Sequence, residues 1–363
     1  MHIKKIKINN YRNYNEAEIS FHEKMNILYG DNAQGKTNIL ESIYICATTK
    51  SHQGSKDKEI IKMGCDEAHV KMYIEKEGLE HYIDLHLKKN KPKGIAVNGI
   101  PIKRSAELMG IINIVLFSPE DLNIIKNGPS ERRRFIDMEL CQLSRIYLDN
   151  LYRYSKVLNQ RNHLLKQISY NESLKETLSV WDEQLIKYGT EIIKERKEFI
   201  EQINNISAEI HKKLTGEKEF LNIQYEPNVD VEEFADKLYK NYNRDIYYQI
   251  THTGPHRDDI KFISNDMDLR TYGSQGQKRT AALSLKLSEI EIVKKKTGDI
   301  PVLLLDDVLS ELDRNRQNYL LESIDDVQTI ITCTGLEEII NHSLDVNRIY
   351  KIENGNVTDI EMR

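Results

Sequence analysis

The sequence lacks the features that mark membrane, secreted and zinc-binding proteins. No apolar run approaches the roughly 20 residues that a helix needs to cross a bilayer, and the stretch from Met1 to Asn10 alternates lysine with isoleucine where a signal segment would be apolar. The four cysteines are far apart and form no CxxC pair, which argues against a disulfide framework and against structural zinc. We therefore expect a cytoplasmic protein without a membrane partner.

An excess of positive charge is also missing, because 52 lysines and arginines stand against 57 aspartates and glutamates, for a net charge of −5. Any DNA binding must therefore come from local clusters. The candidates are Lys4, Lys5 and Lys7, then Lys88 to Lys93, then Arg132 to Arg134. Each cluster could instead be a solvated face, and the arginines could pack against the rest of the chain. No aromatic platform is interleaved with them, so we expect little sequence specificity.

What the sequence does contain is a globular composition, with 39% hydrophobic residues in a chain of 363, long enough for two domains. Residues 69–102 alternate in a strand pattern, and Asn98 and Gly99 predict a hairpin turn. From 129 to 244 the chain shows no strand alternation, and apolar residues from Leu178 to Ile210 recur at helical spacing. We expect a discontinuous α/β domain made of residues 1–128 and 245–363, with a helical arm domain at 129–244.

Residues near 30 predict a phosphate-binding loop. An apolar strand expected at Met25 to Tyr29 leads into a P-loop pattern and then into a helix; the loop residues are Gly30, Asp31, Asn32, Ala33, Gln34, Gly35, Lys36 and Thr37. Glycines let backbone N–H groups surround phosphate oxygens at the positive end of the helix dipole. Lys36 would reach the β- and γ-phosphates, and Thr37 would ligate Mg²⁺. The alternative is a glycine-rich turn that binds nothing.

Two acids follow another apolar strand. The run Val302 to Leu305 ends in Asp306 and Asp307, as expected for a central parallel strand with a site at its carboxyl end. Asp306 would hold Mg²⁺ through its water shell, and Asp307 would orient or deprotonate the attacking water. Acids can also cap a strand without a catalytic role, but the P-loop in the same chain favours the catalytic interpretation.

A second small-residue helix start comprises Ser274, Gln275, Gly276 and Gln277. Ser274 is a good N-cap residue and could be only that. Such a start is also a second phosphate cradle. Because one site cannot readily use both cradles, we expect the second to serve a nucleotide bound by another subunit.

Several of these motifs resemble known families. Ser274 to Gln277 resembles the ABC signature motif, Ser310 to Asp313 resembles the D-loop, and their order is that of SMC-like heads. The particular variants resemble the RecF family over essentially the whole chain. They are Tyr11 to Tyr14, Gly35 to Asn38 followed by Leu40 and Glu41, Phe117 to Leu122, Arg132 to Phe135, Thr253 to Asp259, and Leu305 to Asp307.

The resemblance implies an α/β fold: an ABC-type P-loop ATPase head, with a mixed sheet and an antiparallel β subdomain, and an inserted helical domain. ATP with Mg²⁺ would drive head-to-tail dimerisation, each P-loop facing the partner's Ser274, Gly276 and Gln277. The resemblance also implies DNA binding, slow ATP hydrolysis, and action with the mediators RecR and RecO in recombinational repair, replication and the SOS response. Asn38 and Arg12 join the nucleotide site by the same resemblance.

Some positions depart from the ABC pattern. Asp307 replaces the glutamate of most ABC ATPases, and its shorter side chain would hold water less closely, in keeping with slow turnover. No Q-loop glutamine or switch histidine is evident. Residues 118–121 are candidates for the first role, and Thr332 or Thr334 for the second.

Three basic residues each allow two interpretations. Arg12 could contact a phosphate or could simply face solvent on an edge hairpin, and His256 and Arg257 could contact DNA or a partner or only complete a turn. The function also keeps competing hypotheses. A transporter-type ABC subunit is the runner-up, although the helical insertion and the signature residues argue against it. A metabolic P-loop kinase or GTPase is a third hypothesis, but the guanine-specific NKxD motif is missing.

Overall fold

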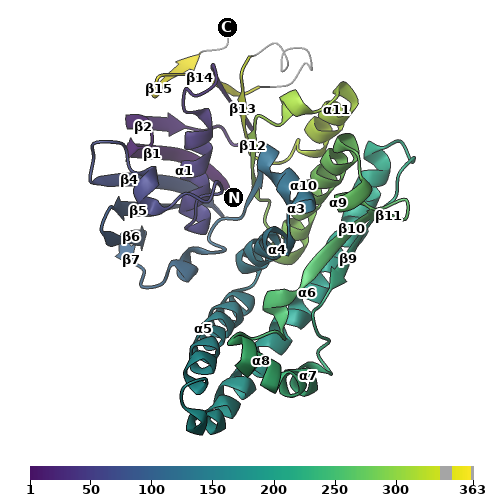
Figure 1. Ribbon diagram of the computed structural model, residues 1–363. Coiled ribbons are helices and arrows are strands. Elements are labelled where there is room, and N and C mark those ends of the chain that lie inside the picture. Colours follow the sequence, from purple (N-terminus) through teal and green to yellow (C-terminus); the bar gives the residue numbers. More distant parts are fainter. Residues whose placement is uncertain (336–345, 361–363) are drawn as a thin grey trace. The chain divides into compact units, whose positions relative to one another are not determined.

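The computed structural model describes residues 1–335 and 346–360, which form two compact units. The first unit comprises Met1–Asp121 and Glu289–Arg363, and the second comprises Leu122–Ser288. The expected arm at 129–244 lies inside the second unit, which continues further toward the C-terminus. Figure 1 labels most of the helices and strands of both units.

An antiparallel sheet in the first unit has the strand order β2-β1-β4-β5-β6-β7. Its strands are β1 (His2–Tyr11), β2 (Tyr14–Ser20), β4 (Glu67–Lys76), β5 (Leu79–Lys88), β6 (Lys91–Val97) and β7 (Ile100–Pro101). Alternate residues such as Val70, Met72 and Ile74 are buried, because successive side chains of a strand point to opposite faces. The predicted turn is confirmed: Asn98 and Gly99 connect β6 to β7 with φ of 52° and 79°.

A mixed sheet in the same unit has the order β15-β14-β3-β13-β12-β8. Its strands are β3 (Met25–Tyr29), β8 (Ile114–Phe117), β12 (Val302–Asp306), β13 (Thr329–Cys333), β14 (Arg348–Glu353) and β15 (Asn356–Ile360). All pairs are parallel except β14 with β15. The parallel strands therefore bring their carboxyl ends to one edge, where the loops after β3 and β12 carry the motifs.

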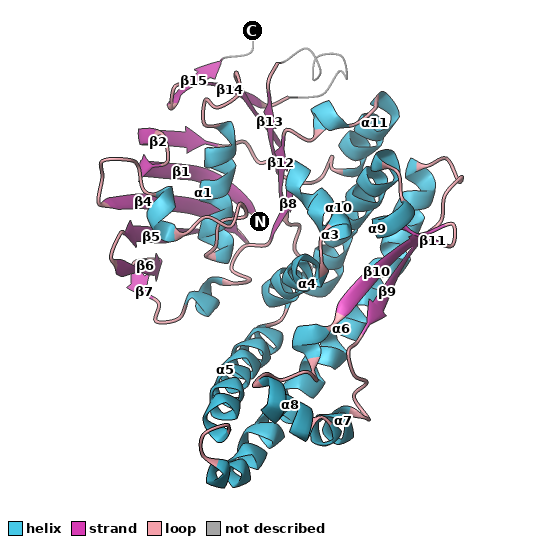
Figure 2. Cartoon of the chain, viewed as in Figure 1, coloured by secondary structure: helices cyan, strands magenta, loops and turns pink. Residues whose placement is uncertain are grey.

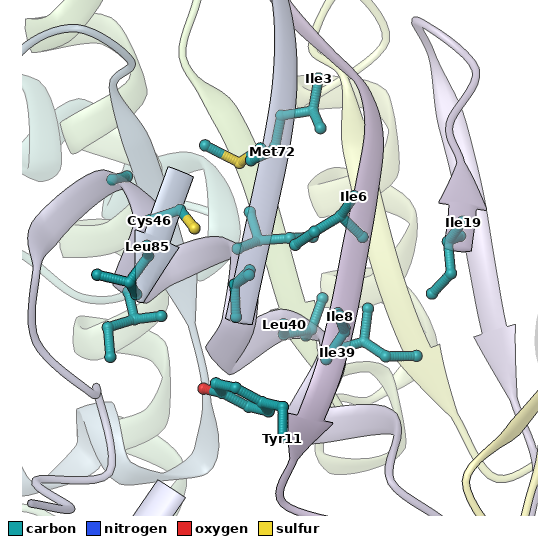
Figure 3. Close-up of a cluster of buried hydrophobic side chains, with 14 of the residues drawn as sticks. Ile3, Ile6, Ile8, Tyr11, Ile19, Ile39, Leu40, Cys46, Met72 and Leu85 are labelled. Carbon is teal, nitrogen blue, oxygen red and sulfur yellow. The ribbon is translucent and has the colours of Figure 1, made fainter. Parts of the chain in front are cut away.

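Helix α1 (Lys36–Thr48) packs against strands of both sheets. Ile39 and Leu40 of this helix belong to a single apolar core with Ile6 and Met72 of the antiparallel sheet and Leu304 of the mixed sheet. Figure 3 shows part of this cluster around α1. The first unit also contains α2 (Asp57–Ile60), η1 (Ser105–Leu108), η2 (Pro119–Asp121), η5 (Leu309–Glu311) and α11 (Arg314–Ser323). The helix that begins at the P-loop is thus fixed by packing on two sides.

The second unit is mainly helical (Figure 2). Its helices are α3 (Leu122–Lys126), α4 (Pro129–Leu143), α5 (Arg145–Ile168), η3 (Glu172–Thr177), α6 (Leu178–Leu214), α7 (Phe234–Lys240), α8 (Tyr242–Tyr248), η4 (Pro255–Arg257), α9 (Leu269–Tyr272) and the start of α10 (Gln275–Thr297). The predicted apolar stripe is confirmed, since Leu178, Leu185, Ile192 and Phe199 of α6 are buried. Helices α5 and α6 pack against each other.

The expectation of no strand between 129 and 244 is wrong. Strand β9 (Leu221–Glu226) pairs antiparallel with β10 (Asp259–Ser264), and β11 (Met267–Asp268) completes a three-stranded sheet. The strand has only two fully buried side chains, Leu221 and Ile223, so its alternation is too short to stand out in the sequence. Its stability comes from pairing with a distant segment.

Buried arginines bind the helical unit together. Arg161 donates from Nε to Asp182 at 2.6 Å and from Nη1 to Asp245 at 2.8 Å. Arg196 of α6 donates to Asp258 at 2.8 Å and to Asp137 at 2.7 Å. Each guanidinium thus lies between two carboxylates, which offsets the cost of burying its charge. Within the described part of the chain, no helix is long and apolar enough to span a bilayer.

Candidate nucleotide-binding site

The loop between β3 and α1 has the backbone of a tight cradle. Gly30, Ala33 and Gly35 have φ of 153°, 63° and 116°. A Cβ at Gly30 would lie 2.2 Å from the carbonyl oxygen of Ile352, so only glycine fits there. Gly35 is the N-cap of α1 and provides no side-chain cap, which leaves the first N–H groups of the helix for an anion. The loop therefore fits phosphate, as the P-loop pattern predicts.

Lys36 lies at the start of α1, and its side chain folds back over the loop. Its Nζ donates to the carbonyl oxygens of Gly30 at 2.6 Å and Asp31 at 2.9 Å. Burial lowers the pKa of this ammonium, while the nearby carboxylate of Asp307 opposes the shift. The cation is held inside the cradle by two neutral acceptors, and phosphate oxygens would be stronger acceptors for it.

The structure brings Thr37, Asp306 and Thr332 together at the carboxyl edge of the mixed sheet. Oδ1 of Asp306 accepts hydrogen bonds from the hydroxyls of Thr37 at 2.9 Å and Thr332 at 2.7 Å. Burial raises the pKa of Asp306, and these two hydroxyls partly oppose the shift. One carboxylate and one hydroxyl beside a phosphate cradle fit Mg²⁺, which is usually held by one or two carboxylates together with substrate phosphates.

Asp307 follows the strand with φ of 52°, in the left-handed region, and its carboxylate acts on the pKa of Lys36. Its backbone N–H donates to the Thr332 hydroxyl at 2.9 Å, so one threonine holds both acids. The hydroxyl of Ser310 donates to the carbonyl of Asp307 at 2.9 Å, and Asp313 caps helix α11. Thr332 is thus buried among the catalytic candidates, whereas Thr334 is exposed.

Arg12 does not simply face solvent. Its guanidinium donates to both carboxylate oxygens of Glu41 on α1, at 2.7 and 2.6 Å, and its side chain is only 19% exposed. Asn13, the next residue, donates to the carbonyl of Gln34 at 2.8 Å and accepts from the Asn38 side chain at 2.9 Å. The hairpin between β1 and β2 therefore supports the P-loop directly. Asn13 and Glu41 belong to the family-like motifs in the sequence, but the sequence alone predicted no role for either residue.

Ser274, Gly276 and Gln277 form the start of α10 in the second unit. Ser274 Oγ accepts from the backbone N–H of Gln277 at 3.2 Å, and Gln277 Oε1 accepts from the backbone N–H of Ser274 at 2.9 Å. This is a reciprocal capping box. Ser274 and Gly276 are exposed in the single chain. The N-cap interpretation is confirmed, and it leaves the exposed turn available to a ligand.

The lysine clusters are occupied by ion pairs. Lys4 lies 3.2 Å from Glu75, and Lys5 and Lys7 lie 3.0 and 2.8 Å from Glu18. In the second cluster, Lys88, Lys89 and Lys93 pair with Glu67, Asp66 and Asp57. These pairs reduce the positive charge that either cluster offers to DNA.

Arg132 is buried and forms a two-pronged ion pair with Asp259, at 2.6 and 2.9 Å. Arg133 donates to the carbonyl of Asp258 at 2.6 Å. His256 contacts the Tyr154 hydroxyl through Nδ1 at 2.6 Å and the Thr251 carbonyl through Nε2 at 3.0 Å. The structure therefore favours packing for these arginines and the turn interpretation for His256. In the Q-loop candidate, residues 118–121, the backbone N–H of Ser118 donates to the Asp121 carboxylate at 2.7 Å. The Q-loop role of this segment stays a prediction.

Comparisons with known proteins agree with this geometry. The family model described as RecF/RecN/SMC N terminal domain matches residues 2–358. The chain is 62% identical over 357 residues to the DNA replication and repair protein RecF of Lachnoclostridium phytofermentans, covering 98% of this chain and 99% of that one. It is 61% identical over 361 residues to the protein of the same name from Lachnospira eligens, covering 99% of each.

Solved structures give the same result. One is described as "Structure of the recombination mediator protein RecF-ATP in RecFOR pathway"; it has a TM-score of 0.93, 38% identity, and coverage of 99% of this chain and 98% of that one. An Smc head domain from Pyrococcus furiosus shares the fold, with a TM-score of 0.58, 18% identity, and coverage of 99% and 96%. The expected ABC-type ATPase head is confirmed, and these relatives do not support the transporter hypothesis. The chain belongs to the RecF family.

Proposed function

We propose that this chain is an ATP-dependent DNA-binding protein of recombinational repair, replication and the SOS response. ATP binding joins two copies on DNA, and slow hydrolysis separates them. The relatives are named DNA replication and repair proteins, and a solved relative is described as RecF-ATP. RecR and RecO are the mediator partners to test, and the cytoplasm is the expected compartment.

The observation that carries the proposal is the convergence of Lys36, Thr37 and Asp306 at one edge of the mixed sheet. The loop amides and Lys36 would bind the phosphates. Thr37 and Asp306 would hold Mg²⁺, which would offset charge on the phosphate oxygens. Asp307, held by Thr332 through its backbone, would orient the attacking water.

Head-to-tail pairing completes the site. The turn at Ser274 is a second anion cradle, exposed in the single chain, and it belongs to a different unit from the P-loop. A triphosphate clasped by the P-loop of one copy and the Ser274 turn of another would stabilise the dimer by mass action.

Sedimentation velocity with ATP, with ADP and without nucleotide tests this function. The wild type should dimerise with ATP but not with ADP or without nucleotide. Lys36→Met should stay monomeric, whereas Lys50→Met, which changes an exposed lysine beyond the end of α1, should behave as wild type. Asp307→Asn should form a long-lived ATP dimer because it binds but hydrolyses poorly. A Lys36→Met chain that dimerises like the wild type would contradict the mechanism.

DNA binding needs its own measurement. Affinity for DNA should rise with ATP and fall steeply with salt, because contacts with phosphates release counterions. The same titration should show little difference between sequences. Salt-independent binding would remove phosphate contacts from the proposal.

A further inference from the structure

Glu219 connects the end of the long helix α6 to the turn at Ser274. It lies in the segment between α6 and β9, and its Oε1 accepts a hydrogen bond from Nε2 of Gln277 at 3.2 Å. The same amide uses its oxygen to accept the N–H of Ser274 at 2.9 Å. The oxygen of the Gln277 amide therefore bonds Ser274, and its NH₂ group bonds Glu219.

These two bonds fix which way the Gln277 amide points. An amide has one accepting end and one donating end, and only the accepting end can serve the Ser274 N–H. The carboxylate of Glu219 can only accept, so it selects the orientation in which the NH₂ group faces it. Without Glu219, a flipped amide would place its NH₂ group against the Ser274 N–H and break half of the capping box.

The capped turn also leaves the Ser274 hydroxyl ready for an anion. Because Ser274 Oγ accepts the N–H of Gln277 at 3.2 Å, its own hydrogen remains available to donate. The hydroxyl is on an exposed residue at a helix start, where the dipole favours negative charge.

Glu219 is itself held in place. Its backbone N–H donates to the Thr215 hydroxyl at 3.3 Å, at the C-cap of α6. Its Oε2 lies 3.6 Å from Nε2 of His211, which is buried in the last turns of α6. Nδ1 of His211 contacts the Ser284 hydroxyl on α10 at 3.0 Å. The carboxylate is thus positioned by the helix that it connects to the turn.

We infer that Glu219 is a positioning residue for the Ser274 turn, holding the Gln277 amide in the orientation that presents the turn to a triphosphate bound by a second copy of this chain. The inference rests on the proposed head-to-tail function. The described contacts of Glu219 are with the turn and with the end of α6, and the P-loop belongs to the other unit, so we expect the affinity of the P-loop for ATP not to depend on Glu219.

Three variants test this role. Glu219→Ala should weaken ATP-dependent dimerisation by about tenfold, since each dimer contains two such turns and each loses one hydrogen bond. Glu219→Gln should restore dimerisation, because its side-chain oxygen still accepts from Gln277. Glu217→Ala, an exposed glutamate two residues earlier that pairs with Lys212, is the matched control and should behave as wild type. ATP affinity of the single subunit, measured at concentrations too low for dimers, should be equal in all.

The outcomes separate the two ideas. If the wild type dimerises with ATP and Glu219→Ala does so equally well, the role of Glu219 is wrong while the proposed function stands. A Glu219→Gln chain as weak as Glu219→Ala also overturns the acceptor role, as does an ATP affinity of the single subunit that falls together with dimerisation. A wild type that does not dimerise with ATP overturns the proposed function itself.

Discussion

The hydroxyl of Thr37 lies 2.9 Å from the carboxylate of Asp306, although 269 positions separate the two residues in the sequence. The sheet produces this contact, because β13 pairs in parallel with both β3 and β12. Thr37 lies one loop after β3, and Asp306 is the last residue of β12. Both oxygens are ligands of the type that Mg²⁺ takes in nucleotide sites.

Removing the Thr37 hydroxyl should separate ATP binding from Mg²⁺. Thr37→Ala keeps the loop amides and Lys36, so we expect residual ATP binding whose Mg²⁺-dependent part is at least about tenfold weaker. Thr37→Ser keeps the hydroxyl and is the matched control. Thermal unfolding with ATP, with and without MgCl₂, measures the difference. An unchanged Mg²⁺-dependent shift in Thr37→Ala would remove Thr37 from the metal site.

Thr332 should matter for hydrolysis more than Thr334. Its hydroxyl donates to Asp306 at 2.7 Å and accepts the Asp307 N–H at 2.9 Å. Thr332→Val has nearly the same shape but makes neither bond. We expect its hydrolysis rate to be at least about tenfold lower, since hydrogen bonds to charged groups contribute about 1.5–3 kcal/mol. Thr334→Val changes an exposed residue two positions later and should be neutral. Steady-state ATPase rates of the two variants measure the difference. A larger loss of rate in Thr334→Val than in Thr332→Val would assign the role to Thr334 instead.

Much of this site could be predicted from the sequence, because its parts are local. A strand, a glycine loop and a helix start lie within a few residues of one another, and each has its own pattern. The predicted strand Met25 to Tyr29 matches β3, and the helix predicted after it is present as α1. Their chemistry follows from residue type alone.

The parts that could not be predicted depend on distant partners. Strand β9 forms because β10, more than 30 residues later, completes its hydrogen bonds. The ion pairs of Lys4 could not be predicted either, because Glu75 and Glu80 come beside Lys4 only in the folded sheet. The role of Glu41 on α1 also depends on Arg12, which lies in the turn between β1 and β2. Local patterns in the sequence do not reveal which distant segments or side chains pair in the folded chain.

The ion pair of Arg12 with Glu41 should contribute strongly to stability. Glu41 is fully buried, which by itself raises its pKa, but hydrogen bonds from Arg12, Ser51 and Tyr11 outweigh burial and hold the pKa below its usual value. Arg12→Ala leaves a buried carboxylate without its cation, so the free energy of unfolding should fall by about 3–5 kcal/mol. Denaturant unfolding measures this loss.

A double variant provides the control for that pair. Glu41→Gln combined with Arg12→Ala removes both charges, so it should recover part of the stability lost in Arg12→Ala alone. The stabilising effect of the pair should be complete above the pKa of an unfolded glutamate and should be lost as the pH falls through the lower folded value. Equal stability of the single and double variants would mean that the charge of Glu41 is not what the arginine stabilises.

His256 should make the stability of the helical unit depend on pH. Its Nε2 faces the Thr251 carbonyl at 3.0 Å and must carry a hydrogen, and in the neutral ring Nδ1 accepts from the Tyr154 hydroxyl at 2.6 Å. Burial lowers the pKa of His256 to about 4. An unfolded histidine titrates near pH 6.5, so between about pH 6.5 and pH 4 the unfolded chain binds a proton that the folded chain does not.

Stability should therefore be complete above about pH 6.5 and decrease by about 3 kcal/mol as the pH falls to 4, from this residue alone. His256→Gln can keep both contacts, with its NH₂ group on Thr251 and its oxygen on Tyr154, but cannot titrate. Denaturant unfolding of both proteins at pH 7.5, 6 and 5 isolates the effect, because the other histidines are common to both. If the two curves of stability against pH run parallel, His256 is not the titrating group. A neutral ring at pH 7 also gives His256 no charge with which to attract a DNA phosphate.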